Sequence, residues 1–257
     1  MWNQHFKQFL AGAAVFSTAL LFSANIWAAD KKAELNSTKD FGGKWGTKVE
    51  EAIEALKLKG NLEDGQIIYE EICEICHQPG GHGDPAGNFP QLAGQHSSVI
   101  IKQIADIRAG NRDNPTMYPF ANIEALQAST EDLFDDPKSG PQTLADVAAY
   151  IQTLIMASTV KGEGNDLEHG AKIYKENCVR CHGDHGQGSF KNYYPVIAGQ
   201  NFKYLLRQFR WIKEGKRRNA NPEMVEQIKN FSERDIQAVM DFSSRQSMKP
   251  GDWDPNK

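Results

Sequence analysis

Two short cysteine motifs constrain this chain more than any other feature of its sequence. Each has the form Cys-x-x-Cys-His, and together they comprise Cys73, Cys76 and His77 in one copy and Cys178, Cys181 and His182 in the other. They use all four cysteines of the 257-residue chain, too few for a disulfide scaffold. This motif is typical of covalent haem c attachment, in which two thiols form thioethers to the porphyrin and the adjacent histidine binds the iron.

Other uses of a Cys-x-x-Cys pair have to be weighed against this one. In an oxidising compartment the pair could be a disulfide or a redox-active dithiol. A zinc site usually brings its two cysteine pairs within about 15–20 residues of each other, whereas 101 residues separate Cys76 from Cys178 here. None of these alternatives requires a histidine after both second cysteines. Two haem c groups, and therefore no free thiol, are the favoured interpretation.

The first 29 residues predict export. Lys7 is their only charged side chain, and a mostly apolar run over 9–27 is followed by two alanines. A basic start, an apolar stretch and small residues at its end are typical of a secretory signal. The run is also nearly long enough to be retained as a membrane anchor, which needs about 20 apolar residues. No other segment is apolar enough to cross a membrane.

The two motifs belong to an internal repeat. Adding 105 to the numbers of 65–110 gives 16 identities in 46 positions without a gap. A unit of about 100 residues has the size of a domain rather than of a solenoid repeat. The predicted organisation is a signal peptide (1–29), an N-terminal extension (30–61), a first domain (62–157), a linker (158–164), a second domain (165–247) and a C-terminal tail (248–257).

Both copies show the same order of helical segments and no convincing strand, so the predicted class is all-α. A short helix leads into each motif, a glycine-rich loop follows, and an amphipathic helix is expected over 97–109 or 201–214. A last helix is expected over 143–154 or 232–242, with Thr143 and Ser232 as N-caps because each has an acidic residue three positions on.

The second axial ligand of each iron decides the function. A methionine there gives a low-spin electron carrier with a raised potential, whereas an open position permits small-ligand chemistry. Met117 and Met224 both occur in Asn-Pro-x-Met, 40 residues after His77 and 42 after His182. The proline restricts the backbone and can present the methionine rigidly. Met117 and Met224 are therefore the predicted axial ligands.

The other methionines and histidines are expected to have different roles. Met156 and Met240 lie on the last helices and are interpreted as packing residues. Surface or loop positions are expected for the histidines without a counterpart in the other copy, which are His82, His96, His169 and His185. Bis-histidine ligation through His82 or His96 is a minor alternative. No nucleophile-and-base motif is present, so no catalytic residue is predicted.

At this level of detail the sequence resembles the dihaem class I c-type cytochromes, and within them the cytochrome c4 group. The resemblance covers roughly 62–157 and 163–246. It rests on both Cys-x-x-Cys-His motifs, on the pair of segments 90–95 and 195–200, on the segment 204–217, and on the late Met117 and Met224. It implies two tandem homologous class I cytochrome c domains, each wrapping one covalently bound haem, with the haem edges meeting at the domain interface.

The function that the resemblance implies is electron transport without an enzymatic activity. The protein would be a periplasmic carrier of single electrons between a respiratory reductase or dehydrogenase and a terminal acceptor such as an oxidase. Its partners would be periplasmic or membrane-bound redox proteins, with membrane contact only through such a partner or a retained anchor. The alternative is a dihaem oxidoreductase, or the cytochrome subunit of one, acting for example on thiosulfate or peroxide through a labile axial ligand. A binding module with structural haems is the weakest interpretation.

The charge is distributed unequally over the chain. The net charge of −4 argues against nucleic acid as a partner. Residues 29–157 hold 11 basic and 20 acidic side chains, a net −9, whereas 158–257 hold 17 basic and 13 acidic, a net +4. Part of the acidity lies in a stretch over 131–136, within about 18 residues that only the first copy carries after Met117. Such a polarity predicts that the two ends attract different redox partners, with rates that depend on salt.

Overall fold

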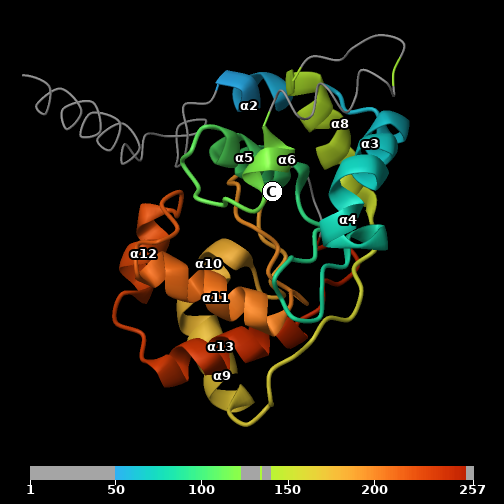
Figure 1. Ribbon diagram of the computed structural model, residues 1–257. Coiled ribbons are helices and arrows are strands. Elements are labelled where there is room, and N and C mark those ends of the chain that lie inside the picture. Colours follow the sequence, from blue (N-terminus) through green and yellow to red (C-terminus); the bar gives the residue numbers. More distant parts are fainter. Residues whose placement is uncertain (1–49, 123–133, 135–139, 253–257) are drawn as a thin grey trace, which may run out of the picture. The chain divides into compact units, whose positions relative to one another are not determined.

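The structure, a computed structural model, describes residues 50–122, 134 and 140–252. These residues are mainly helical (Figure 1), and an isolated bridge between Ser189 and Tyr194 is the only β-pairing among them. The all-α expectation is confirmed. The helices are α2 (Glu50–Ala55), α3 (Leu62–Ile68), α4 (Glu74–His77), α5 (Ser97–Arg108), α6 (Tyr118–Ala121) and α8 (Gly140–Thr153) in the first half, and α9 (Leu167–Asn177), α10 (Val179–His182), α11 (Phe202–Lys213), α12 (Pro222–Ile228) and α13 (Glu233–Arg245) in the second half.

The halves follow the sequence repeat. In the first, a π-helical turn (Tyr69–Cys73) joins α3 to α4, and a 3-10 turn (Pro79–Gly81) follows α4. In the second, α9 runs to Asn177 and only Cys178 separates it from α10. Helices α5 and α11 begin and end within one residue of the predicted limits. The repeat in the sequence is thus a repeat of helices in the same order.

Helices α3 and α8 of the first half cross at a glycine, and so do α9 and α13 of the second half. A Cβ atom added to Gly65 of α3 would lie 2.1 Å from the carbonyl oxygen of Asp146 in α8. The equivalent Cβ on Gly170 of α9 would lie 2.2 Å from the carbonyl oxygen of Ala238 in α13. Because both distances are far shorter than a van der Waals contact, only glycine permits the two backbones to approach this closely.

An aromatic pair accompanies each crossing. Tyr69 packs against Tyr150 with ring centroids 5.7 Å apart, and Tyr174 packs against Phe242 with centroids 5.5 Å apart. Both pairs are tilted, with interplanar angles of 49° and 52°. Tyr69 and Tyr174 are fully buried beside the start of each cysteine motif. The crossing therefore fixes the point at which each motif begins.

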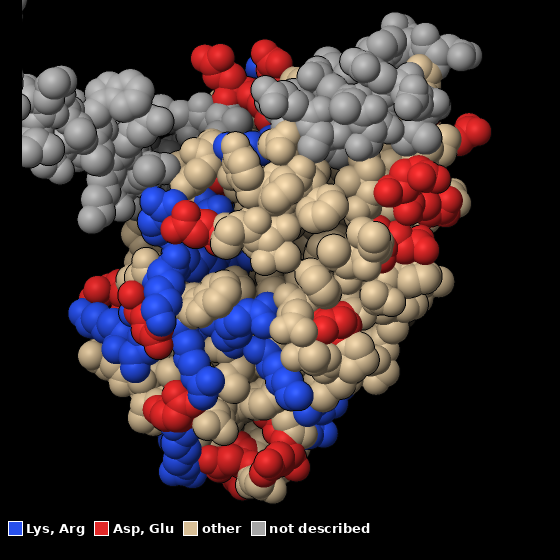
Figure 2. All heavy atoms as spheres, viewed as in Figure 1, with Lys and Arg blue, Asp and Glu red and all other residues tan. Residues whose placement is uncertain are grey.

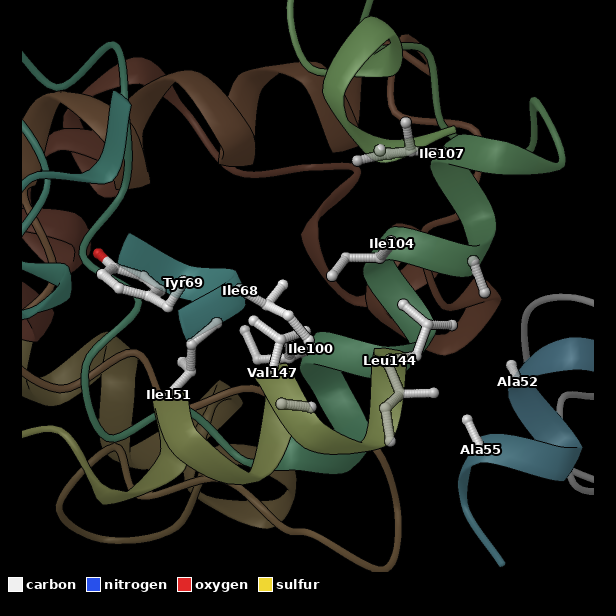
Figure 3. Packing of buried hydrophobic residues seen from close by; sticks show 14 residues of the cluster. Ala52, Ala55, Ile68, Tyr69, Ile100, Ile104, Ile107, Leu144, Val147 and Ile151 are labelled. Carbon is white, nitrogen blue, oxygen red and sulfur yellow. The ribbon is translucent and has the colours of Figure 1, made fainter. Parts of the chain in front are cut away.

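The N-terminal extension contributes to the core of the first half. Helix α2 buries Ala52 and Ala55 in the same apolar cluster as Leu144 of α8, and Figure 3 shows both alanines directed towards that helix. Glu51 of α2 forms an ion pair with Arg108, the last residue of α5. The amphipathic stretch in the extension is thus a structural part of the first half, a role that its sequence left open. The predicted signal peptide lies outside the described residues.

One of the two predicted helix caps is confirmed and the other is wrong. The Ser232 side chain accepts from the Asp235 N–H while Asp235 caps the Ser232 N–H, which is a complete capping box. Thr143 is not a cap, because α8 includes Gly140 and Thr143 is buried inside the helix. Pro141 explains the earlier start, since a proline in the first turn needs no helical hydrogen-bond acceptor.

The predicted linker, 158–164, runs along the second half. The N–H groups of Gly162 and Gly164 donate to the two carboxylate oxygens of Asp241 in α13, at 3.0 and 2.7 Å. The Phe202 N–H donates to the Val160 carbonyl oxygen at 2.9 Å. This segment is therefore held by α13 and by the start of α11. The limits of the domains on either side stay a prediction.

The glycine crossings provide a test of the fold. Replacing Gly65 or Gly170 by alanine should lower the free energy of unfolding by about 1–3 kcal/mol, because the added methyl group overpacks the crossing. Alanine normally stabilises a helix relative to glycine by about 1 kcal/mol, so the sign of the change is diagnostic. Urea denaturation followed by circular dichroism measures it. The exposed Lys172→Ala in α9 is the control and should stay within about 0.5 kcal/mol of the parent; a stabilised G65A or G170A would contradict the crossing.

Candidate functional site

A cavity of about 690 Å³ receives side chains from both halves of the molecule. All eight residues predicted to bind the cofactors line it: Cys73, Cys76, His77 and Met117 from the first half, and Cys178, Cys181, His182 and Met224 from the second. Apolar residues of both cores, including Ile104 and Phe209, complete its wall. The fold therefore brings together residues that are up to 151 positions apart in the chain.

The turn after each motif is held by a buried tyrosine. Helix α4 ends at Gln78 with φ of 66°, and α10 ends at Gly183 with φ of 77°. The Tyr69 hydroxyl donates to the Gln78 carbonyl oxygen, and the Tyr174 hydroxyl donates to the Gly183 carbonyl oxygen, both at 2.7 Å. The left-handed conformation is unusual for Gln78. The tyrosine hydrogen bond and the packing around it hold this strained turn in place.

The two motif histidines are oriented in the same way. His77 Nδ1 lies 3.0 Å from the Pro90 carbonyl oxygen, and His182 Nδ1 lies 3.0 Å from the Pro195 carbonyl oxygen. A carbonyl oxygen can only accept, so Nδ1 carries the proton and donates, which leaves Nε2 with its lone pair. Burial lowers the pKa of both histidines, more than the carbonyl partners raise it. Each ring is thus a neutral imidazole with one nitrogen available to a metal.

No disulfide joins the members of either cysteine pair. Burial raises the pKa of the Cys73 and Cys178 thiols to about 12. A redox-active dithiol requires the opposite shift, because the attacking species is a thiolate. No group of three or more His, Cys, Asp or Glu side chains in the part of the chain that the structure describes could hold a metal ion. The disulfide, dithiol and zinc alternatives therefore lack structural support.

The two Asn-Pro-x-Met segments adopt different structures. In the first half the Met117 N–H donates to the Asn114 side chain at 3.3 Å, and Met117 immediately precedes α6. In the second half Asn221 caps α12 by accepting from the Glu223 N–H at 2.8 Å, which places Met224 inside that helix. Both methionines are half-buried and pack against the core of their own half. The same Asn-Pro-x-Met sequence thus places its methionine in the cavity wall in two different local conformations.

The structure shows where Met240, Met156 and His96 pack. Met240 is buried in the second core, as expected, and also lines the cavity. Met156 lies beside Gly94 near the contact between the halves. His96 lies in the loop just before α5, one of the two positions expected for it, and does not line the cavity. It is nevertheless buried at the contact between the halves, where its Nε2 donates to the Gln187 carbonyl oxygen at 2.8 Å. The sequence did not predict this burial, because it depends on the packing of one repeat on the other.

The remaining histidines in the described part of the chain do not line the cavity. His169 pairs with Asp235 at 2.7 Å, and His185 pairs with Asp252 at 2.9 Å. His82 is exposed and does not line the cavity. The minor alternative of ligation by His82 or His96 therefore has no support from the geometry.

Glutamines of the repeated Ala-Gly-Gln sequence join the halves in a reciprocal manner. The Gln95 side chain donates to the Val196 carbonyl oxygen at 3.0 Å and accepts from the Val196 N–H at 2.9 Å. The equivalent Gln200 donates to the Gln91 carbonyl oxygen at 2.7 Å and accepts from the Gln91 N–H at 3.0 Å. Each glutamine side chain thus forms hydrogen bonds with both the N–H and the carbonyl oxygen of one residue in the wall of the cavity, as a paired backbone would. The repeat displayed these residues, but only the packed structure shows their role.

Comparison with known proteins shows similarity to c-type cytochromes in both halves. Residues 62–154 match the family described as "Cytochrome c", and residues 165–242 match the family described as "Cytochrome C oxidase, cbb3-type, subunit III". Cytochrome c4 from Azotobacter vinelandii is 29% identical over 182 residues, which are 66% of this chain and 82% of that protein. The "Thiosulfate dehydrogenase electron acceptor" of Stutzerimonas stutzeri is 29% identical over 206 residues, 73% of this chain and 88% of that protein.

A solved structure shows the same arrangement. Reduced recombinant cytochrome c4 from Pseudomonas stutzeri superimposes with a TM-score of 0.60 and 26% identity, over 73% of this chain and 100% of that one. The chain is a dihaem cytochrome c4-like protein. It consists of two tandem cytochrome c domains and carries two covalently bound haem c groups. It is an electron-transfer protein.

The residues of the cytochrome c4-like cavity fit such a group. Each half supplies two cysteines three residues apart, a neutral imidazole whose Nε2 keeps its lone pair, and the thioether of a methionine, all lining one largely apolar space. These are the donors that haem c attachment and ligation require. Within the described ranges no helix combines the length and the hydrophobicity needed to cross a membrane.

The glutamine pair provides a test of how the halves are joined. Gln95→Ala or Gln200→Ala should each lower the free energy of unfolding by about 1–3 kcal/mol, because a backbone N–H at the contact loses its acceptor. Denaturant unfolding of the haem-containing protein measures the change. Gln66→Ala is the matched control, since its side chain makes an exposed hydrogen bond within its own half, and it should change stability by less than about 0.5 kcal/mol. Equal effects of all three substitutions would contradict this role.

Proposed function

We propose that each half attaches its haem through its two motif cysteines and ligates the iron with one histidine and one methionine. Cys73 and Cys76 form the thioethers of the first half, with His77 and Met117 as axial ligands. The second half uses Cys178, Cys181, His182 and Met224 in the same roles. The observation that carries this proposal is that all eight side chains line one cavity. The orientation of both histidines by a proline carbonyl supports it, since it fixes the nitrogen that remains free.

The role of the protein residues is to make the iron a carrier and not a catalyst. Haem iron supplies one-electron exchange between its ferrous and ferric states. A methionine in the sixth position leaves no site for a substrate and favours the ferrous state, which raises the potential. The apolar wall excludes water and limits reorganisation around the metal. The alternative of an oxidoreductase with a labile ligand is not favoured, because both halves place a methionine in the cavity.

The place of this carrier in the cell follows from the N-terminus and from the relatives. The sequence of 1–29 supports export to the periplasm, where c-type cytochromes exchange electrons with soluble and membrane-bound proteins. One relative is named as an electron acceptor of thiosulfate dehydrogenase, and one matching family is described by an oxidase subunit. We therefore propose a respiratory route in which the protein receives electrons from a dehydrogenase or reductase and passes them to a terminal oxidase.

Removal of the proposed methionine ligands tests the site. Met117→Ala and Met224→Ala should each convert one haem of two, with loss of half of the methionine–iron charge-transfer band in the oxidised protein. The potential of that haem should fall, because a thioether ligand raises it, and cyanide should then bind it. Absorption spectroscopy and a redox titration measure these changes.

The control for this test is Met156→Ala, which removes a methionine that does not line the cavity and should leave both haems unchanged. Retention of the full charge-transfer band in M117A or M224A would show that the assigned ligand is wrong. A high-spin haem in the unaltered protein that binds cyanide readily would show that the protein is not a simple carrier.

The surfaces around the two motifs differ in charge at equivalent positions. Glu70 of the first half corresponds to Lys175 of the second, and Ile75 corresponds to Arg180; all four are exposed. Figure 2 shows acidic residues gathered over α3 and α4 and basic residues over α11. The acidic set consists of Glu63, Asp64, Glu70, Glu71 and Glu74, and the basic set of Lys203, Arg207, Arg210 and Lys213.

Each surface also carries exposed aromatic side chains. Tyr118 and Phe120 follow Met117 and are 49% and 47% exposed, and Phe120 lines the cavity. In the second half Arg207 lies 5.4 Å above the ring of Trp211, and both residues line the cavity. Apolar contact area with a charged rim is the usual composition of an interface that forms and dissociates. We therefore propose that the first half docks a partner with a basic surface and the second half a partner with an acidic one.

Charge reversal tests this assignment. Glu70→Lys should slow electron exchange with a cationic probe, tris(phenanthroline)cobalt(III), by about two- to fivefold at low salt, and Lys175→Glu should do the same for the anionic probe ferricyanide. Stopped-flow rates over a range of ionic strength measure both effects. Glu163→Lys and Lys249→Glu are controls, because these exposed residues lie in the predicted linker and C-terminal tail, away from both cysteine motifs in the sequence. Salt-independent rates, or equal effects of the controls, would remove the steering proposal.

A further inference from the structure

Helices α5 and α11 begin at equivalent residues that lie at the contact between the halves. His96 precedes α5 and Asn201 precedes α11, and the repeat relates the two positions. Both residues are buried, with exposed fractions of 2% and 3%. Each side chain reaches the loop that follows the cysteine motif of the other half, and neither lines the cavity. His96 and Asn201 are therefore a matched pair of contacts between the halves.

The Asn201 amide uses both of its donors and both of its acceptor positions. Its oxygen accepts from the N–H groups of Lys203 and Tyr204, at 2.9 and 3.3 Å, and so caps α11. Its nitrogen donates to the Asp84 and Pro85 carbonyl oxygens of the first half, at 3.2 and 3.3 Å. Because an amide has no proton to gain near neutral pH, this contact does not respond to acid.

His96 makes only part of the equivalent contact. Its Nε2–H donates to the Gln187 carbonyl oxygen of the second half at 2.8 Å. A carbonyl oxygen only accepts, so the proton lies on Nε2 and the other ring nitrogen, Nδ1, carries a lone pair. That Nδ1 atom is buried without a hydrogen-bond partner among the described residues, and it does not cap α5. His96 is thus a neutral imidazole at this contact.

Protonation of His96 is unfavourable while the contact is closed. It would bury a second N–H without an acceptor and place a positive charge at the positive end of the α5 dipole. The Phe190 ring packs against the imidazole, with ring centroids 6.3 Å apart. Burial lowers the pKa of His96, more than the Gln187 carbonyl oxygen raises it. The geometry and the direction of this shift agree.

In the described part of the chain, no charged side chain is placed to compensate a protonated His96. The facing loop carries three titratable residues, Asp184, His185 and Lys191. Of these, the first and the last are exposed, and His185 is paired with the C-terminal tail. On α5 itself, Lys102 and Asp106 pair with each other. Helix α8 meets the start of α5 through the neutral amide of Gln152.

We propose that His96 is a positioning residue that joins the two halves while its imidazole is neutral and releases the loop of the second half when it is protonated. The equivalent contact at Asn201 stays closed. The contact on which electron exchange between the two haem groups depends is thus strongest near neutral pH and weaker in acid. This inference goes beyond the proposed function and requires no particular axial ligand.

Replacement of His96 by the residue that the repeat places at the equivalent position tests the proposal. A histidine with an unfolded pKa of 6.5 and a lowered folded pKa stabilises the fold above pH 6.5, and this stabilisation is lost as the pH falls through the folded pKa. Between about pH 7.5 and pH 5, the unfolding equilibrium constant of the parent should therefore rise about tenfold more than that of His96→Asn. Urea denaturation of the haem-containing protein at each pH measures both.

Two controls separate this effect from a general weakening of the contact. The Ser98 hydroxyl donates to the Phe190 carbonyl oxygen at 2.7 Å, also across the contact. Ser98→Ala should therefore destabilise the protein by the same factor at both pH values. His82→Asn removes an exposed histidine and should alter neither the stability nor its pH dependence. The same pH dependence in H96N as in the parent, or its loss in S98A, would overturn the proposal.

Hydrogen exchange of the unaltered holoprotein decides the matter even where a variant does not fold. After correction for the intrinsic pH dependence of exchange, amides of 183–195 should exchange about tenfold faster at pH 5 than at pH 7.5, because local opening removes their protection. The equivalent segment of the first half, 78–90, is held by Asn201 and should keep its protection. Equal behaviour of the two segments, or unchanged protection of 183–195, would show that His96 does not control the contact.

Discussion

The cavity between the halves is the constraint on which the rest of the structure depends. Its wall is built from the same side chains that form the two cores, such as Ile68 and Ile100 in the first half and Leu205 in the second. Each core therefore has one face that only a bound apolar group can cover. Because covering apolar surface stabilises by about 25 cal/mol per Å², binding of the cofactor and stability of the fold are two aspects of one interaction.

Gene duplication has a direct structural consequence at this cavity. The faces that meet are equivalent parts of the two repeats, so every useful contact between them occurs twice. Gln95 and Gln200 each bind the backbone of the opposite half, and His96 and Asn201 each donate to a carbonyl oxygen of the opposite half. A pseudo-two-fold relation of this kind places the two redox centres in one electrostatic environment, which is a condition for electron exchange between them.

The departures from this symmetry give the two ends different properties. Lys102 and Asp106 form a buried ion pair in α5, whereas the equivalent positions of α11 hold Arg207 and Trp211, which form a cation–π contact in the cavity wall. The motif surfaces differ likewise, since Glu70 stands where the second half has Lys175. A carrier that receives electrons from one protein and passes them to another benefits from ends that attract different partners. The acidic stretch over 131–136 lies outside the described residues.

The sequence by itself determined the chemistry, because attachment and histidine ligation depend on residues adjacent in the chain, and adjacency is visible without a fold. The gapless repeat likewise predicted two helical domains, and local chemistry predicted the cap at Ser232. The tertiary structure decided what depends on distant partners. It buried His96 against Gln187, joined α2 to the first core, and gave Met117 and Met224 different local geometries. It also brought Arg112 and Arg217 together, which no pattern within one repeat could reveal, because each arginine donates a hydrogen bond to the other half.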